Sequence, residues 1–117
     1  MSEVKYSKET VIEKAAELTK TVGAKVHPLV FSRDGGQTHI VGYLKEPARI
    51  VKMRALSKSI SDPAQAGAEI LEICLLKEHS DNRIYSESPE NDDIYMGACV
   101  EALTTIQVLQ NVLEKKR

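Results

Sequence analysis

The stretch YLKEPARIVKMRALSKSISDPAQAGAEILEICLL, residues 43–76, decides the fold, because a strand end runs into two helices that each begin at a proline. Pro47 and Pro63 both suit a first helical turn, since that turn leaves its N–H groups unpaired and proline presets a helical φ. Asp62 precedes Pro63 and is the expected N-cap of the second helix. The stretch therefore predicts one helix from Pro47 and another from Pro63.

The first of these helices carries apolar residues at three- and four-residue spacing, which is typical of an amphipathic helix. We expect this stripe to face the core and the basic residues to form the outer face. The stripe consists of Ile50, Met53, Leu56 and Ile60. The basic residues are Arg49, Lys52, Arg54 and Lys58.

The second helix is apolar around more of its circumference, so we expect it to be the most buried helix. Its stripe consists of Ala66, Gly67, Ile70, Leu71 and Cys74. Gly67 costs roughly 1 kcal/mol in a helix relative to alanine. Close approach of a neighbouring helix backbone explains a glycine here, and contact with a ligand is the alternative.

An amphipathic helix and a β-hairpin precede this stretch. Ser7 is the expected cap of the helix, and Gly23 suits the left-handed position that ends it. Residues 25–32 and 38–44 alternate as strands around a turn at residues 33–37. Pro28 cannot donate to a ladder, so its strand should be an edge strand or begin after it. A lone hairpin is barely stable, so helices must cover a face or a partner must extend it.

Two histidines flank the hairpin. His27 and His39 could be cross-strand neighbours, and paired imidazoles can bind a metal. Two ligands without a nearby carboxylate or thiolate make a weak site, so surface histidines are the simpler interpretation.

Residues 77–93 form a long polar connection with six acidic and two basic side chains. Loops of this length tend to be functional or flexible. Ile84 and Tyr85 are an apolar pair within it. They either pin the loop to the domain or contact a protein partner, so both are candidate partner-binding residues.

The last helix is expected to begin at the caps Asn91 to Asp93 and to run for roughly five turns, with its apolar stripe reaching Leu113. Val108 and Val112 lie off that stripe. A second apolar face on a helix indicates self-association or partner docking. These two valines complete the candidate partner-binding set.

Length and composition narrow the class of protein. We expect one α+β domain over residues 1–117, with a frayed end at 1–6 and an N-terminal helix, a β-hairpin and three helices packed as a small bundle. The 16 basic and 17 acidic side chains nearly cancel, which argues against nucleic-acid binding. No apolar run reaches the roughly 18 residues of a membrane span, and the N-terminus lacks a signal-peptide core, so a cytoplasmic location is expected.

No catalytic, nucleotide-binding or metal-binding motif occurs in the sequence. Cys74 and Cys99 fall on expected core stripes and should be buried thiols. A nucleophile and base formed by one of them with His79 would need the thiol to leave the core. We therefore expect a non-enzyme with no cofactor and no metal.

Several segments together resemble the tail assembly chaperones of long-tailed bacteriophages and prophages. The resemblance covers residues 38–113 and rests on YLKEP at 43–47, on DP followed by AGAE at 62–69, and on an apolar run to Cys74. Ser80-Asp81 and Asp93-Ile94-Tyr95 with the final helix extend it. It implies a protein of the bacterial host cytoplasm that binds the long, apolar tape measure protein while the tail tube assembles.

Two other hypotheses remain open at this point. A structural virion component, such as a tail completion or tube-associated protein, would stay in finished particles, whereas a chaperone would be absent from them. A small ligand-binding domain or enzyme would need a deep pocket with converging polar side chains. Self-association into a homo-oligomer also stays open.

Overall fold

The computed structural model describes residues 7–106 and residue 108, and it has an α+β fold. Its main elements are α1 (Lys8–Val22), β1 (Val26–Arg33), β2 (Thr38–Lys45), α2 (Arg49–Ser59), α3 (Pro63–Cys74) and α4 (Asp92–Leu103). Short 3₁₀ turns are η1 (Asp34–Gly36), η2 (Lys77–His79), η3 (Asn82–Ile84) and η4 (Pro89–Asn91). The expected order of a helix, a β-hairpin and three further helices is confirmed.

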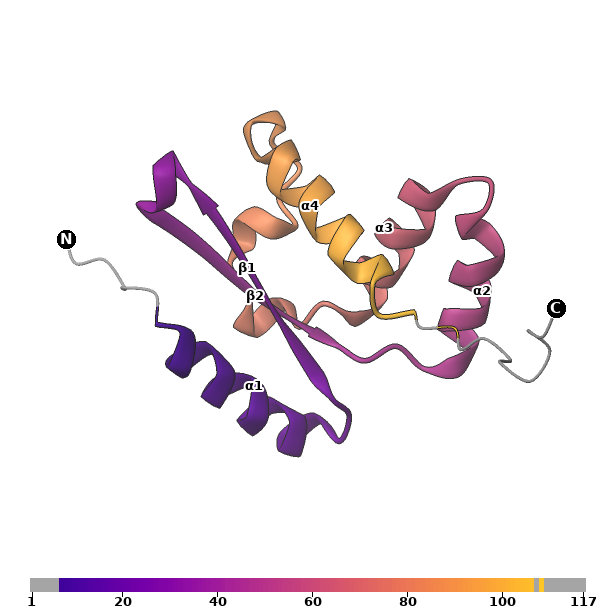
Figure 1. Cartoon of the computed structure of the whole chain (residues 1–117), viewed down its shortest axis with the longest axis horizontal. Helices are drawn as coiled ribbons and strands as arrows, with labels where there is room; N and C mark the ends of the chain where they lie inside the picture. The colour runs from indigo at the N-terminus through magenta and orange to yellow at the C-terminus, as the bar shows by residue number, and fades with distance from the viewer. Residues whose placement is uncertain (1–6, 107, 109–117) are drawn as a thin grey trace, which may run out of the picture.

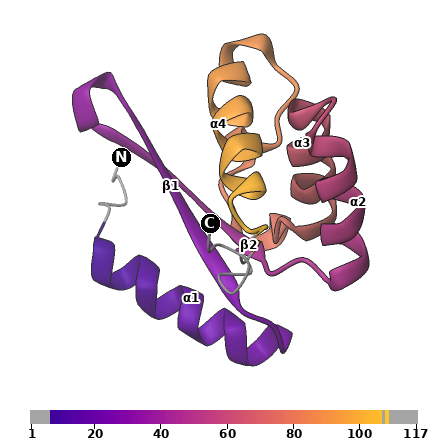
Figure 2. The same cartoon turned by 45° about the vertical axis from the view of Figure 1, so that its right-hand side comes forward.

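The hairpin lies between two layers of helix. Figure 1 shows α1 on one side of the strands and α2, α3 and α4 on the other, and the turned view in Figure 2 agrees. Because successive side chains of a strand point to opposite faces, each face of the hairpin has its own apolar cluster. The cluster under α1 consists of Val11, Ala15, Leu18, Val26 and Tyr43. The larger cluster on the opposite face includes Leu29, Ile40, Leu44, Ile70, Ile84 and Ile94.

Local capping signals set several helix ends. The Ser7 hydroxyl accepts a hydrogen bond from Thr10 N, and Gly23 ends α1 with a φ of 83°. Asp62 caps α3 by accepting a hydrogen bond from Gln65 N at 3.2 Å. These three predictions are confirmed. α2 differs, because it begins at Arg49 and not at Pro47.

The hairpin register separates the two histidines. Three successive positive φ angles, of 55°, 65° and 92° at residues 34–36, reverse the chain at the expected turn. His27 pairs with Leu44, whereas His39 pairs with Ser32. Four residue pairs lie between these two positions on the ladder, and strand alternation puts the two side chains on opposite faces. The expectation that the histidines are cross-strand neighbours is therefore wrong.

The segment after α3 covers the outer edge of β2. Leu76 N donates to Tyr43 O and Asp81 N donates to Val41 O, both at 2.9 Å. β1 carries the opposite edge of the two-stranded sheet, and Pro28 lies in it opposite Tyr43. The expectation that Pro28 marks an edge strand is confirmed.

Gly67 marks the closest approach of α3 and α4. A β-carbon at this position would lie 2.3 Å from the carbonyl oxygen of Cys99, which is far inside van der Waals contact. Gly67 is buried, as are Ala66 and Ala98 beside it on the two helices. The interpretation of Gly67 as a helix-packing glycine is confirmed.

The apolar stripe predicted for the core side of α2 faces solvent instead. Ile50 is 67% exposed, Met53 is 57% exposed and Ile60 is 88% exposed. Ala55 is fully buried and packs in the core with Val51 nearby. The sequence therefore predicted the amphipathic character of α2 but assigned its faces wrongly.

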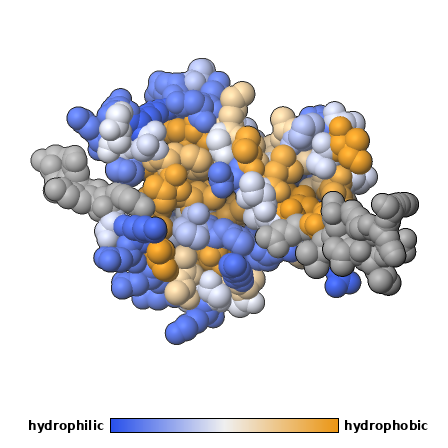
Figure 3. All heavy atoms as spheres, in the orientation of Figure 1, coloured by the Kyte–Doolittle hydropathy of each residue, from blue (hydrophilic) through white to orange (hydrophobic). Residues whose placement is uncertain are grey.

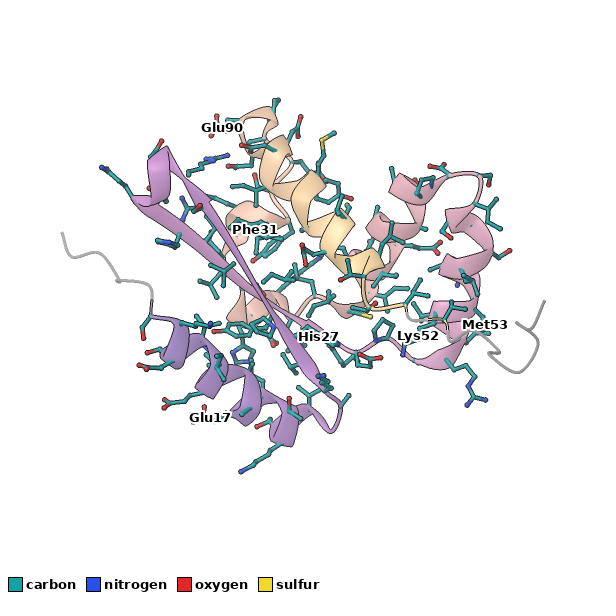
Figure 4. All side chains as sticks on the ribbon, viewed as in Figure 1. Glu17, His27, Phe31, Lys52, Met53 and Glu90 are labelled. Atoms are coloured by element: carbon teal, nitrogen blue, oxygen red, sulfur yellow. The ribbon has the colours of Figure 1, made fainter. Side chains whose placement is uncertain are left out.

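Ion pairs explain the orientation of α2. Lys58 Nζ lies 3.2 Å from the carboxylate of Glu69 on α3, and Arg54 Nη2 lies 3.0 Å from the same oxygen. Lys52 pairs with Glu46 at the end of the hairpin. In Figure 4, Lys52 lies on the hairpin side of α2 and Met53 lies away from it. Lys52, Arg54 and Lys58 thus tie α2 to the hairpin and α3, and the predicted apolar stripe faces outward.

The connection at residues 77–93 folds into the turns η2, η3 and η4 against the domain. Ile84 is fully buried in the larger cluster, and its Cδ1 atom lies over Gly42 of β2. The Ser80 hydroxyl donates to Leu76 O and accepts from Tyr43 N. The burial of Ile84 confirms the interpretation that this residue pins the loop to the domain.

Asp81 fixes the start of η3 and gives a pH prediction. Its carboxylate accepts from the Arg83 guanidinium at 2.7 and 3.0 Å and from Arg83 N, and the guanidinium lowers the pKa of Asp81 below its ordinary 3.8. The ionised form therefore adds stability above pH 3.8, which is lost as the pH falls through the folded-state pKa. We expect the free energy of unfolding to fall more steeply on acidification in the wild type than in Asp81→Asn. Denaturant titrations between about pH 2 and pH 6 test this, and parallel profiles would contradict it.

α4 is shorter than expected. The hydroxyl of Thr104 donates to Glu101 O at 2.6 Å, and that of Thr105 donates to Ala102 O at 2.7 Å. The backbone of residues 104–106 turns through i to i−3 hydrogen bonds. Two adjacent β-branched residues with hydroxyls that compete for backbone carbonyls favour such an end. The prediction of a helix of roughly five turns is wrong for residues 104–106, and Leu113 lies outside the described residues.

Candidate protein-binding groove

An apolar groove opens between α3 and α4. It has a volume of about 740 Å³. Its apolar lining includes Ala64 and Ala68 from α3 and Tyr95, Met96, Val100 and Leu103 from α4. Met96 is 63% exposed and Val100 is 61% exposed, so large apolar side chains are open to solvent along it. Small residues on one wall and large ones on the other leave space for the side chains of another helix.

The groove continues toward the pinned loop. A second hollow of about 420 Å³ shares Ala68, Asp92 and Tyr95 with the first and reaches Tyr85. The Lys77 ammonium lies 5.4 Å from the centre of the Tyr85 ring, over its face. We call the two hollows together the helix groove.

The charged residues that line the helix groove are mostly acidic. Four are carboxylates and one is basic: Asp62, Glu72, Glu87, Asp92 and Lys77. Carboxylates around an apolar floor favour a ligand that combines an apolar face with flanking cations. An amphipathic helix with basic residues beside its apolar face has this chemistry.

The four sequence-predicted partner-binding residues lie in different surroundings. Tyr85 lines the helix groove. Ile84, its neighbour, is buried in the core and offers no surface to a partner in this conformation. Val108 is 68% exposed and lies beyond the end of α4. Val112 lies outside the described residues.

Sequence reasoning missed Met96 and Val100, although the signal was present. They are four residues apart on α4, and the same four-residue row leads on through Thr104 to Val108 and Val112. An exposed apolar pair is therefore present on α4, but it lies twelve residues, or about three helical turns, before Val108 and Val112. The assumption of a longer helix placed it too far toward the C-terminus.

A polar cleft lined by the hairpin, by Lys52 of α2 and by the end of α4 was also a candidate site. His27 Nε2 lies 2.5 Å from Glu46 Oε1, and Lys52 Nζ donates to Glu46 Oε2. Burial alone would raise the pKa of Glu46, but the hydrogen bonds from Lys52 and His27 outweigh it and lower this pKa. Both carboxylate oxygens are thus occupied in joining the hairpin to α2. The cluster of His27, Glu46 and Lys52 therefore has a structural role, and both Glu46 oxygens are engaged in it.

The two thiols are packed as core groups. Cys74 is 1% exposed and Cys99 is 7% exposed, and both are free cysteines. Burial raises the pKa of each thiol, which disfavours the nucleophilic thiolate. The expectation of buried thiols is confirmed.

Among the described residues, no three His, Cys, Asp or Glu side chains gather closely enough to hold a metal ion. No helix in the described part of the chain has the length and apolar character to span a membrane. Comparison with known proteins gave no matching family model and no similar curated protein or solved structure.

Proposed function

We propose that this chain is a non-catalytic assembly protein that holds an apolar helix of a partner protein in the helix groove. The observation that carries the proposal is the solvent-open apolar floor between α3 and α4, with Met96 and Val100 more than half exposed. Large apolar side chains grouped in one hollow mark an interaction surface. A groove between two packed helices suits an amphipathic helix with anchors at three- and four-residue spacing.

The biological setting of this proposal comes from the sequence resemblance. A phage or prophage tail assembly chaperone binds the tape measure protein, whose long apolar helices need a partner to remain soluble. The helix groove offers a site for such a segment, in the cytoplasm of the bacterial host. Binding would cover the apolar faces of both proteins until the tail tube replaces the chaperone.

The groove variant Met96→Asp with Val100→Asp tests the site. It places two carboxylates on the apolar floor, beside the acidic rim, so we expect at least about 100-fold weaker binding of the partner. A tagged chain is co-expressed with any long, apolar protein that is encoded just downstream, and the recovered complex is measured. The matched control is Ile12→Asp, which changes a residue that is 52% exposed on α1, across the hairpin.

Three outcomes separate the hypotheses. Loss of the complex in the groove variant but not in the control, with unchanged circular dichroism, supports the proposed site. Retention of the complex in the groove variant contradicts it. Recovery of the wild-type chain alone, together with its presence in purified virions, would replace the chaperone with a structural virion component.

A further inference from the structure

A second apolar surface faces solvent on α2, and it has a defined orientation. The α2 stripe consists of Ile50, Met53, Leu56 and Ile60, with exposed fractions from 39% to 88%. Figure 3 shows hydrophobic surface over α2 on the right of the molecule. Ala55 is buried on the opposite side of the helix, and the ion pairs to Glu46 and Glu69 hold that side inward. The stripe is therefore a fixed feature of the surface.

The charged residues of α2 itself are all basic. Arg49 and Arg54 flank it, and the Arg54 side chain remains 59% exposed although it pairs with Glu69. The helix groove has the opposite character, with four carboxylates and one ammonium along its lining. An apolar stripe with basic flanks and an apolar groove with acidic flanks are complementary in both hydrophobicity and charge.

We propose that copies of this chain associate head to tail, with the α2 stripe of one copy seated in the helix groove of the next. This inference rests on the groove as a helix-binding site and is independent of the tail-assembly setting. The anchors at positions 50, 53, 56 and 60 have the spacing of a helix that lies in a groove. They span about 15 Å along α2, and α3 and α4 each offer about 18 Å of groove wall.

The symmetric alternatives bring like charges together. Two α2 stripes packed on each other would oppose Arg49 and Arg54 with the same residues of the second copy. Two grooves packed face to face would bring the carboxylates of one copy against those of the other. Within one chain, the stripe cannot reach its own groove, because α2 is fixed against α3 by Ala55 and Glu69. The proposed contact therefore joins different surfaces of different copies, and when it is repeated in one direction it produces a ring or an open chain.

Sedimentation velocity of the wild-type chain alone, over a range of concentrations, is the first test. We expect species larger than a dimer at high concentration, and weaker association as salt screens the flanking charges. Met53→Asp removes the stripe and Val100→Asp removes the groove. Each variant alone is expected to sediment as a monomer, with association at least tenfold weaker than in the wild type. Ile12→Asp on α1 is the control and should associate normally.

A mixture of the two variants tests the head-to-tail geometry directly. Met53→Asp keeps an intact groove and Val100→Asp keeps an intact stripe, so an equimolar mixture should form a 1:1 dimer and nothing larger. A wild-type chain that stays monomeric, or a mixture that forms no dimer, would overturn the proposal. If either variant misfolds by circular dichroism, Ile60→Asp or Met96→Asp replaces it, since both positions are more than 60% exposed.

The same variants keep the two proposals distinguishable. Met53→Asp should lose self-association but still bind the downstream partner protein, because its groove is unchanged. Val100→Asp should weaken both. A chain that binds its partner through the groove but never self-associates would refute head-to-tail assembly and leave the proposed function intact.

Discussion

Gly67→Ala is expected to lower the free energy of unfolding by about 3 kcal/mol. The added methyl group would lie 2.3 Å from the carbonyl oxygen of Cys99, so α3 and α4 would have to move apart. A backbone oxygen within a helix cannot rotate away as a side chain can. The cost therefore exceeds the gain of roughly 1 kcal/mol that alanine brings to a helix interior. Chemical denaturation followed by circular dichroism measures the change.

Gly97→Ala is the matched control for this prediction. It makes the same exchange in the middle of α4, where the added carbon would meet the Phe31 ring edge at 3.2 Å. The ring can shift by a few tenths of an ångström, and the helix gains propensity. We expect a change within about 1 kcal/mol of zero. Equal destabilisation by both variants would show that the contact between Gly67 and Cys99 is not special.

Ile84→Ala is expected to destabilise the protein by about 3 kcal/mol. The side chain is fully buried between η3 and β2, and its loss would leave a cavity over Gly42. The segment at residues 77–93 should also exchange its amide hydrogens faster, since Ile84 is its main apolar anchor. Denaturant unfolding and hydrogen exchange measure the two effects.

Ile60→Ala makes the same chemical change at a position that is 88% exposed. Little apolar area leaves water there on folding, so we expect a change in stability below about 0.5 kcal/mol. A similar loss for both isoleucine variants would indicate that the loop is not pinned through Ile84.

The parts of the fold that depend on local chemistry were predictable from the sequence. The Ser7 and Asp62 caps, the glycine end of α1 and the hairpin turn each involve residues within a few positions of one another. Gly67 was also interpretable, because a buried glycine in an apolar helix has few explanations. These signals gave the order of elements and the packing of α3 against α4.

The faces of α2 were not predictable, because tertiary partners decide them. Its apolar and basic residues both recur with helical spacing, and nothing local says which set turns inward. Glu46 and Glu69 pair with the basic set while Ala55 and Val51 pack in the core, and Glu69 lies on a different helix. The groove was missed for a related reason, since Met96 and Val100 become a surface only once α3 lies beside α4.

The unusual edge of β1 affects how this protein can aggregate. The backbone N–H and C=O of Tyr43 bond to Ser80 and Leu76, on the side away from β1. Pro28 is paired with Tyr43, so its backbone nitrogen, which has no hydrogen to donate, faces the outer edge of the sheet. The next outward amide, that of Val26, donates to the Thr19 hydroxyl at 3.0 Å. This half of the edge therefore presents no free donor to an incoming strand, and the opposite edge on β2 is already covered. Strand addition and amyloid-like growth should accordingly be disfavoured at this half of the β1 edge.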